Sequence, residues 1–380
     1  MKIIGMMYCL MLITGNCISQ QKIAKHLPAD KMATKETIAL YKHLHALLGE
    51  GVLFGHQDDL AYGVGWQYQP GRSDVKEVVG EYPALYGWEL GHLELDSAKS
   101  LDNVPFDKMK AYIKLGYKRG AAITISWHFT NPLNGKSAWD VTPGSVASIL
   151  PGGAKHDLYK LYLDRLAIFL QDLKGTKGEA IPILFRPFHE LTGNWFWWCQ
   201  NVCTPLEFTS LWKFTVEYLR HTKKLHNILY VYNTAEFKSK EHFLERYPGN
   251  EYVDVVSFDT YQHPNAITPA GNDFIKQIDE RLAMLNEIAL EKNKLPAFAE
   301  TGFEAIPKAD WWTNDLLPSI KKNKLSYVLL WRNAGLMKET GKMHYYVPYK
   351  NQLSAADFKK FYQDKNMIFG KKIAAANIYK

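Results

Sequence analysis

The sequence is poor in several features that define protein classes. Its 380 residues include only four cysteines, no serine- or glycine-rich linker, no internal repeat and no low-complexity tract. Charge of one sign does not dominate, because 46 Lys and Arg are scattered among 39 Asp and Glu. Without a basic stripe or tail, nucleic-acid binding has no support. Since 47% of the residues are hydrophobic, the chain can bury a full core, and disordered and fibrous classes are excluded.

Long apolar runs are limited to one, at the N-terminus. It extends from Ile3 to Ile13, follows a lysine and precedes small and polar residues, which is typical of a secretory signal peptide. The run is shorter than the roughly 20 residues of a membrane span. We therefore predict a signal peptide at residues 1–19 and an exported protein, periplasmic or extracellular, formed by residues 20–380. Lipid attachment at Cys17, which would hold the protein at the cell surface, is the alternative.

Two of the four cysteines, Cys9 and Cys17, lie in the predicted signal region. The other two, Cys199 and Cys203, are four residues apart. In an oxidising compartment this pair can form a disulfide, or both can be free thiols, and the sequence leaves both options open. A zinc site is disfavoured because no second Cys or Cys/His pair completes four ligands.

Short apolar runs that end in polar residues recur along the chain. Near-continuous apolar character is typical of strands that are buried on both faces of a parallel sheet. Eight such runs are present, at residues 51–57, 83–90, 121–128, 182–190, 228–233, 253–261, 296–303 and 325–333. We expect these eight runs to be strands.

Segments with helical spacing lie between these runs. Helices are predicted around residues 38–48 and 158–170 and over 272–294. Thr204 and Glu207 form a capping-box pattern with a proline between them, which predicts a helix from there through Leu219. The second and eighth crossovers are the least clearly helical. Eight alternating units without a linker favour the α/β class, as a single (β/α)8 TIM barrel over residues 20–380.

The ends of the predicted strands carry an unusual number of polar residues. In such barrels the active site lies at the C-terminal ends of the strands. Glu190 ends the fourth run and Glu300 lies in the seventh. A glycosidase needs two carboxyl groups of this kind, one to protonate the leaving oxygen and one to attack the sugar or to activate water. Arg186, Phe188 and Glu190 share parity, so all three are expected to point into the barrel mouth.

Three other interpretations compete with this one. Either glutamate could form a structural ion pair with Arg186 or Arg332. Strand-end histidines could bind zinc, although no His-x-His pair ends a strand, and hydrogen bonding to sugar hydroxyls explains them more simply. A non-catalytic glycan-binding barrel would keep the aromatic residues but lose one carboxylate, and both are present. The four histidines are His56, His92, His128 and His189.

Several motifs resemble glycoside hydrolase family 26, the β-mannanases. They are FRPFHELTGNWFWWC, which begins in the fourth run, GHQDD near the start, SWHFTNP, FAETGF and LLWRN, in the family's order, over about Gly51 to Arg332. The resemblance implies a (β/α)8 barrel, a retaining mechanism with a covalent glycosyl-enzyme intermediate, and no metal or other cofactor. It also implies a polysaccharide substrate, in the first place β-1,4-linked mannan, galactomannan or glucomannan. Mixed-linkage glucan and β-1,3-xylan are the alternative substrates.

The resemblance also implies residue roles. Glu190 corresponds to the acid/base and Glu300 to the nucleophile. If Glu300 is ionised about 5 Å away, its field keeps the proton on Glu190 to higher pH. The residues that correspond to substrate-binding positions are His128, His189, Trp195, Tyr261, Trp331 and Arg332.

Further expectations come from the residues themselves. Trp66 lies in the sequence GVGWQYQPG, a loop that we do not expect to be core, so it is predicted to stack on sugar. Trp139 lies in a long segment and is a second candidate platform. No accessory module is visible, and we expect a monomer. Whether cleavage is internal or releases mannobiose from a chain end depends on loop conformation, which the sequence leaves open.

Overall fold

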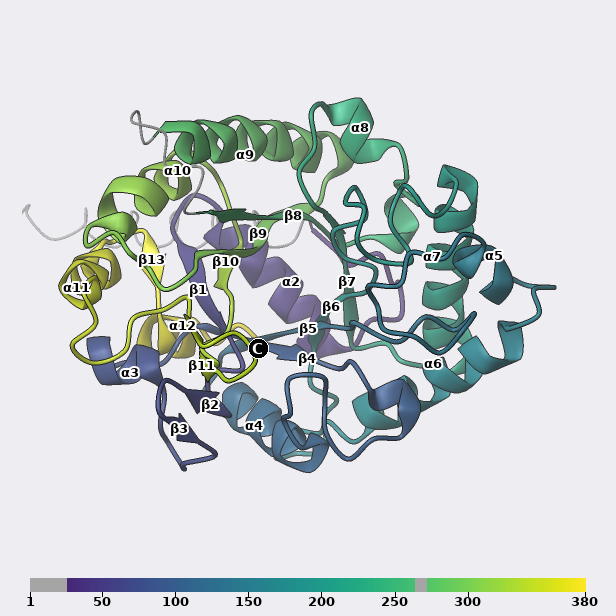
Figure 1. Ribbon diagram of the computed structural model, residues 1–380, viewed down its shortest axis with the longest axis horizontal. Coiled ribbons are helices and arrows are strands. Elements are labelled where there is room, and N and C mark those ends of the chain that lie inside the picture. The colour runs from purple at the N-terminus through teal and green to yellow at the C-terminus, as the bar shows by residue number, and fades with distance from the viewer. Residues whose placement is uncertain (1–25, 264–271) are drawn as a thin grey trace, which may run out of the picture.

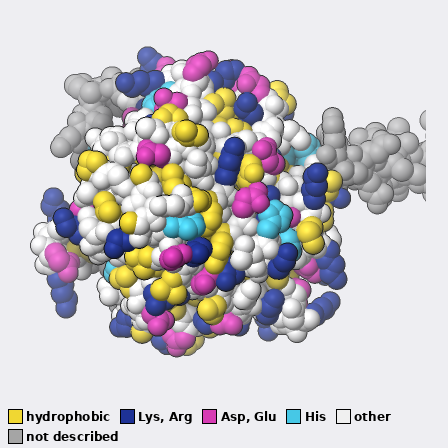
Figure 2. Space-filling model, turned by 90° about the vertical axis from the view of Figure 1, so that its right-hand side faces the viewer, with side chains coloured by type: hydrophobic (Ala, Val, Ile, Leu, Met, Phe, Trp, Pro, Cys, Tyr) yellow, Lys and Arg dark blue, Asp and Glu magenta, His cyan; other side chains and the backbone are white. Residues whose placement is uncertain are grey.

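The computed structural model describes residues 26–263 and 272–380 (Figure 1). The predicted signal peptide, with Cys9 and Cys17, lies outside the described residues. No helix in the described part of the chain is long and apolar enough to cross a membrane. On the side of the molecule that Figure 2 shows, basic and acidic side chains are intermixed.

Eight parallel strands form a closed barrel. In sequence order they pair with their neighbours, and the first strand also pairs with the last, with Leu53 opposite Tyr327. The strands are β1 (Val52–Gln57), β4 (Leu85–Glu89), β5 (Ala122–Ser126), β6 (Ile183–Arg186), β7 (Ile228–Thr234), β8 (Val255–Gln262), β9 (Leu295–Phe303) and β10 (Tyr327–Leu330). Each predicted run overlaps with one of these strands, so the predicted (β/α)8 barrel is confirmed. A short strand, β13 (Met367–Ile368), pairs with the beginning of β1.

Helices surround the barrel (Figure 1). Thr204 and Glu207 form the predicted capping box at the start of α7. The second crossover, which looked weakly helical in the sequence, contains the regular thirteen-residue helix α4. The helices are α2 (Lys35–Leu47), α3 (Asp74–Val79), α4 (Phe106–Lys118), α5 (Ser145–Ile149), α6 (His156–Gln171), α7 (Pro205–Glu217), α8 (Lys240–Leu244), α9 (Asn272–Lys292), α10 (Leu317–Lys322), α11 (Ala355–Gln363) and α12 (Gly370–Ala376).

Two small hairpins extend from the C-terminal ends of the barrel strands. One is formed by β2 (Tyr62–Gly63) and β3 (Trp66–Gln67) after β1. The other is formed by β11 (Gly335–Met337) and β12 (Lys342–His344) after β10. Because β1 and β10 are neighbours in the barrel, both hairpins rise at the same side of its mouth.

The barrel interior is divided into an apolar half and a polar half. At the N-terminal ends of the strands, Leu40, Tyr41 and Leu44 of α2 pack on interior residues such as Leu53 and Leu229 and close the barrel. At the C-terminal ends the interior side chains are polar and charged, and most are fully buried. Burying charged groups is costly unless they are paired or hydrogen-bonded. Because a structural core would not need such groups, the C-terminal end of the barrel is the candidate functional site.

Candidate active site

Glu190 reaches the barrel mouth through a turn rather than through strand parity. Strand β6 ends at Arg186, and Phe188 and Glu190 both have positive φ, at 50° and 56°. This conformation turns Phe188 outward, where its ring packs against Trp197 and Phe208 at the side of α7. The prediction that Phe188 points into the mouth with Glu190 is therefore wrong, because the alternation of a strand stops where the strand ends.

Two contacts hold Glu190 in place. Its backbone N–H donates to Asn233 Oδ1 at 2.7 Å, and the Trp195 indole N–H donates to Glu190 Oε2 at 2.7 Å. Trp195 itself remains 39% exposed, so its ring is accessible to a ligand at the site. One side chain can thus position the carboxyl group and also offer a flat face for a sugar.

Glu300 is placed by a bulge in β9. Phe258 of β8 pairs with Phe298, but the next residue, Asp259, pairs with Glu300, so β9 contains one extra residue at Ala299. Bulges redirect side chains and are frequent beside active sites. As a result, Glu300 is buried to 6% exposure at the barrel mouth.

The partners of Glu300 are charged or polar groups of neighbouring strands. Arg186 donates to Glu300 Oε2 at 2.6 Å, and the Tyr261 hydroxyl donates to Oε1. Arg186 also pairs with Asp259. The structural ion pair that the sequence suggested as an alternative therefore exists, between Glu300 and Arg186, and it lies inside the site.

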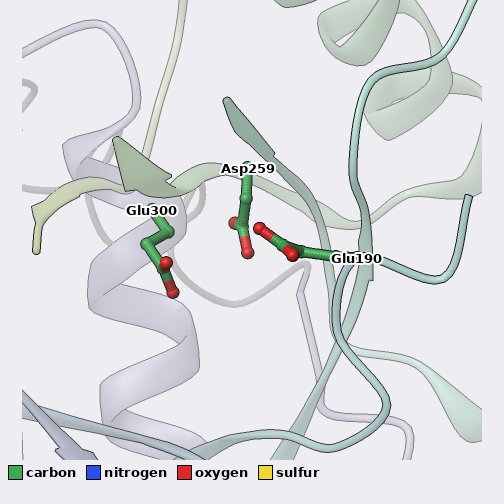
Figure 3. Close-up of side chains that lie close together, drawn as sticks. All are labelled: Glu190, Asp259 and Glu300. Atoms are coloured by element: carbon green, nitrogen blue, oxygen red, sulfur yellow. The ribbon is translucent and has the colours of Figure 1, made fainter. Parts of the chain in front are cut away.

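Three carboxyl groups meet at this point. One oxygen each from Glu190, Asp259 and Glu300 lies within 4.8 Å of the others, and Figure 3 shows the three side chains converging from the turn after β6, from β8 and from β9. Retaining glycosidases place their two carboxyl groups about 5 to 5.5 Å apart, whereas inverting ones keep them at about 6.5 to 9.5 Å. The spacing of Glu190 and Glu300 therefore fits a retaining enzyme.

The environment separates the proton affinities of these groups. Burial and the charge of Glu300 raise the pKa of Glu190 to about 7. Burial, with the nearby Glu300 and Glu190, also raises the pKa of Asp259 despite Arg186. Burial and Glu300 raise the pKa of Tyr261, so its hydroxyl stays a neutral donor. Glu190 can therefore hold a proton at neutral pH, as a general acid must.

A second hydrogen-bonded group lies next to the carboxyl cluster. Glu89, at the end of β4, accepts from the ring Nδ1 of His128 at 2.8 Å and from its backbone N–H at 2.6 Å. Burial would raise the pKa of Glu89, but the His128 charge and these bonds lower it to about 2. Burial lowers the pKa of His128, but the Glu89 charge and hydrogen bond raise it by more, so the pKa of His128 lies above its ordinary value. Glu89 thus favours the charged form of His128.

His189 is the neutral partner of His128. Burial, His128 and Arg186 lower the pKa of His189. The Nε2 atoms of the two rings are 2.9 Å apart; in the charged form of His128 its Nε2–H donates and His189 Nε2 accepts. The exposed Trp139 stacks on the His128 ring, with centroids 5.3 Å apart and planes at 12°. These contacts fix the orientation of both imidazoles beside Glu190.

The strand-end histidines do not gather into one group. His56 pairs with Asp59 at 2.8 Å, away from the contact between His128 and His189. Among the described residues, one group of three side chains has the spacing of metal ligands, and it is the carboxyl cluster of Glu190, Asp259 and Glu300. Its oxygens already accept from Arg186 and Tyr261.

Two hollows lie at the C-terminal end of the barrel. One, of about 570 Å³, borders Glu190 and Trp195. The other, of about 900 Å³, is lined by the two hairpins, Asp102 and Arg332. Arg332 pairs with Asp102 at 3.2 Å, and its predecessor Trp331 lies edge-on to the His128 ring. We refer to the two hollows together as the groove.

Trp66 differs from the prediction. Its side chain is buried to 6% exposure, its indole N–H donates to Asp74 at 2.7 Å, and the Arg72 guanidinium lies over its ring. The segment is the β2–β3 hairpin rather than an open loop, so the expectation of an exposed stacking platform is wrong. Trp66 instead supports the wall of the larger hollow.

The sequence interpretation did not assign roles to Asp259, Glu89 or Asp102. Asp259 and Tyr261 are two apart at the end of β8, and this shared parity was a usable signal. Glu89 ends β4 in the same way. Asp102 is in a loop, and only the tertiary structure brings it to Arg332.

Cys199 and Cys203 are buried free thiols. Cys199 donates to the Glu190 carbonyl and Cys203 to the Trp198 carbonyl. Burial raises the pKa of both thiols to about 12. The structure therefore has the free-thiol form of the two options.

Comparisons with known proteins agree with this geometry. The sequence model of Glycosyl hydrolase family 26 matches residues 29–315. A mannan endo-1,4-beta-mannosidase of Bifidobacterium adolescentis is 31% identical over 90% of the chain, which spans 35% of that relative's length. One of Bacillus subtilis is 26% identical, over 77% of this chain and 78% of that one.

Solved structures show the same relation. A GH26 beta-mannanase from Bacteroides ovatus is 43% identical with a TM-score of 0.84, covering 89% of this chain and 96% of that one. The catalytic domain of a GH26 endo-beta-1,4-mannanase from Bacillus sp. JAMB-750 is 29% identical with a TM-score of 0.85, covering 95% and 98%. On its sequence match, its barrel and its paired carboxyl groups, the chain belongs to glycosyl hydrolase family 26.

Proposed function

We propose that this protein is a retaining endo-β-1,4-mannanase in which Glu190 is the acid/base and Glu300 the nucleophile. The observation that carries this proposal is the pair of carboxyl groups within 4.8 Å in unlike environments. Glu190 has a pKa of about 7, whereas Glu300 accepts from Arg186 and Tyr261. Two carboxyl groups with separated proton affinities are the requirement for the two roles.

The first step forms a glycosyl-enzyme. Glu300 attacks the anomeric carbon while the proton of Glu190 passes to the leaving glycosidic oxygen, so the glycosidic bond breaks as the ester bond forms. The charge on Glu300 is then lost, and with it one of the causes of the high pKa of Glu190. Glu190 can therefore ionise and take a proton from the water that releases the sugar.

The groups around the pair support both steps. The Trp195 indole N–H on Glu190 Oε2 favours the ionised carboxylate, which acts in the second step. Burial lowers and Glu89 raises the pKa of His128, which lies next to the site, and a ring N–H there can bond the hydroxyls of the sugar being cleaved. Tyr261 donates to Glu300 Oε1, and burial and Glu300 raise its pKa, so it remains a neutral donor.

The roles of Glu190 and Glu300 determine the direction in which the substrate chain lies in the groove. The acid must face the leaving group, so the hollow beside Glu190 and Trp195 receives the reducing-end part of the chain. The hollow lined by Asp102 and Arg332 receives the part that becomes bound to Glu300. Two hollows that each receive part of the chain support cleavage within a chain, with manno-oligosaccharides and mannobiose as products.

The substrate is proposed from the relatives. The family members described above are named as acting on mannan, and no feature of the groove favours mixed-linkage glucan or β-1,3-xylan instead. We also propose that the protein acts as a monomer, because one barrel supplies both carboxyl groups. Its expected location is outside the cytoplasm, on the strength of the apolar run at Ile3–Ile13.

The substrate is tested by a time course of product sizes from β-1,4-mannan, with xylan and mixed-linkage glucan in parallel. A ladder of manno-oligosaccharides from mannan alone is the expected result. Mannobiose from the first time point would contradict internal cleavage. Products from another glycan but none from mannan would contradict the substrate while leaving the mechanism intact.

The roles are tested by azide rescue on an activated aryl β-mannoside. Glu300→Ala with azide is expected to give the inverted glycosyl azide, and Glu190→Ala with azide the retained one. Glu304→Ala, one position beyond the end of β9 and bonded to His344, is the control and should keep wild-type turnover. Unchanged mannan hydrolysis by Glu300→Ala would refute its role as nucleophile.

A further inference from the structure

The end of the barrel opposite to the active site carries a hollow of about 1280 Å³ with a basic rim. It lies at the N-terminal ends of β5 and β6, between the end of α4, the loop at residues 174–180 and the last residues after α12. Five exposed lysines stand around it, and together we call them the basal patch: Lys114, Lys118, Lys174, Lys177 and Lys380.

The charge of the basal patch is only partly offset locally. None of its five lysines forms an ion pair with a described residue. Of the two acidic residues in the hollow, Glu36 pairs with Lys35, whereas Glu179 accepts from the Tyr117 hydroxyl and the Lys177 backbone N–H and offsets part of the Lys177 charge. The patch therefore presents net positive charge to solvent at any physiological pH.

Some lysines outside the patch are paired with carboxylates. Lys160 pairs with Asp157, and Lys240 pairs with Glu291. On the side face in Figure 2, basic and acidic side chains are intermixed. The basal patch differs in that five unpaired lysines surround one hollow, which holds two acidic residues.

Two large apolar side chains are exposed at the same end. Leu27 is 62% and Met32 67% exposed. The segment between them is anchored there, since the backbone N–H of Ala29 donates to Asp254 at 2.7 Å and Asp30 bonds His226 at 2.8 Å. Asp254 and His226 immediately precede β8 and β7, so this segment lies at the N-terminal ends of the strands.

We propose that this end of the barrel rests on a lipid bilayer with anionic headgroups. Unpaired lysines beside exposed apolar side chains match such a surface, where lysine ammonium groups bind headgroups and apolar side chains enter the interface. The active-site groove then faces away from the bilayer, toward a polymer in solution. This inference does not depend on the proposed hydrolytic activity, because it concerns the opposite end of the molecule.

The point where the chain enters the barrel agrees with this orientation. Cys17, the alternative site of lipid attachment, precedes His26 by nine positions, which span at most about 30 Å when extended. His26 directly precedes the anchored segment at the basal end. A lipid on Cys17 would therefore hold the same end of the barrel against the bilayer that the patch favours.

The test uses the chain from Gln20 onward, which lacks Cys17 and includes all described residues. Binding is measured by sedimentation with vesicles of phosphatidylcholine, with and without phosphatidylglycerol, at low and high salt. The patch variant carries Lys118→Glu, Lys174→Glu and Lys177→Glu. The matched control, with the same net charge, carries Lys155→Glu, Lys276→Glu and Lys359→Glu, all outside the hollow.

The expected result is binding to anionic vesicles only, weakened by salt. With about 1 kcal/mol, or about fivefold, for each lysine near the surface, the patch variant should bind at least about 100-fold more weakly and the control nearly as the wild type. Replacing Leu27 and Met32 with serine should lower the binding that persists at high salt. All variants should keep wild-type mannan hydrolysis, which reports that the barrel is folded.

Three outcomes would overturn the proposal. The first is no binding of the wild type to anionic vesicles. The second is an equal loss in the patch variant and in the control, which would indicate net charge alone. The third is binding to a soluble anionic polysaccharide, such as polygalacturonate, without binding to vesicles, which would assign the patch to a polymer.

Discussion

Replacement of Glu300 by glutamine should lower the pKa of Glu190. Glutamine keeps the shape of the side chain but removes the negative charge, and that charge is the second-largest cause, after burial, of the high pKa of Glu190. Arg186 donates to Oε2 and Tyr261 to Oε1, so the single amide oxygen of glutamine keeps one of these two donors, and the NH2 group takes the place of the other acceptor. The variant thus removes the negative charge that the proposed mechanism requires, at the loss of one hydrogen bond.

The magnitude follows from the distance between the two carboxyl groups. One oxygen of each group lies within 4.8 Å of the other, and for unit charges at that limit Coulomb's law gives about 0.9 kcal/mol in water and about 3.5 kcal/mol at an effective dielectric constant of 20. At 1.36 kcal/mol per pKa unit, the pKa of Glu190 should fall from about 7 by between about 0.6 and about 2.5. Burial keeps it above the ordinary value of a glutamate.

The pKa is measured by NMR titration of carboxyl-labelled glutamate, and Glu190→Gln identifies the signal. Glu304→Gln is the matched control, because Glu304 is an exposed glutamate bonded to His344, and it should change the pKa of Glu190 by less than about 0.3. If Glu300→Gln leaves the pKa of Glu190 near 7, burial alone sets it. The account in which loss of the Glu300 charge turns the acid into a base would then be refuted.

Three further predictions concern the same site. Trp195→Phe keeps the ring but removes the N–H bond that lowers the pKa of Glu190, so the alkaline limb of kcat/KM should move up by less than about one pH unit; a downward shift in the pH profile would contradict this. Glu89→Gln removes the charge that raises the pKa of His128, so His128 should titrate at lower pH in an NMR titration. The value of kcat/KM should fall about 10- to 100-fold at pH 7. Wild-type activity together with a neutral His128 would show that the charge of His128 is not needed. Native Glu190 holds its proton up to about pH 7, whereas the unfolded side chain releases it near pH 4.5, so the stability of the wild type falls as the pH rises between those values. Glu190→Gln should therefore stabilise the protein by up to about 3 kcal/mol at pH 8 and change its stability little at pH 4. Equal denaturation midpoints of the variant and the wild type at both pH values would rule this out.

The barrel and the two main carboxyl groups could be read from the sequence for a simple reason. Strands buried on both faces have to be apolar along their whole length, so a change to polar residues marks a strand end. All eight strands follow this rule, and the C-terminal strand ends of a barrel converge on one mouth. Glu190 and Glu300 were recognised in this way before any distance was known.

The orientation of these side chains was not predictable by the same rule. Strand alternation predicts that Phe188 shares the direction of Glu190, but positive φ values after β6 separate them. Likewise, the extra residue at Ala299 is visible only as a shift in pairing between β8 and β9. A prediction from local periodicity assumes a regular backbone. The turn after β6 and the bulge in β9 are irregular, and they change the direction of the side chains of Glu190 and Glu300.

Burial of the aromatic residues also depends on the partners that the fold brings. Trp66 has a sequence context typical of an exposed loop, but Asp74 and Arg72 enclose it.

The ion pair of Asp102 and Arg332 joins residues that are 230 positions apart in the sequence, and no short-range pattern encodes it.

The sequence by itself thus determined the class of fold and which residue types stand at the barrel mouth, because both depend on local apolar patterning. The tertiary structure alone decided how far apart Glu190 and Glu300 lie, that burial and the Glu300 charge raise the pKa of Glu190, and that Glu89 raises the pKa of His128 against the effect of burial. Proton affinity depends on burial and on charges from distant parts of the chain, and these exist only once the strands have closed into a barrel.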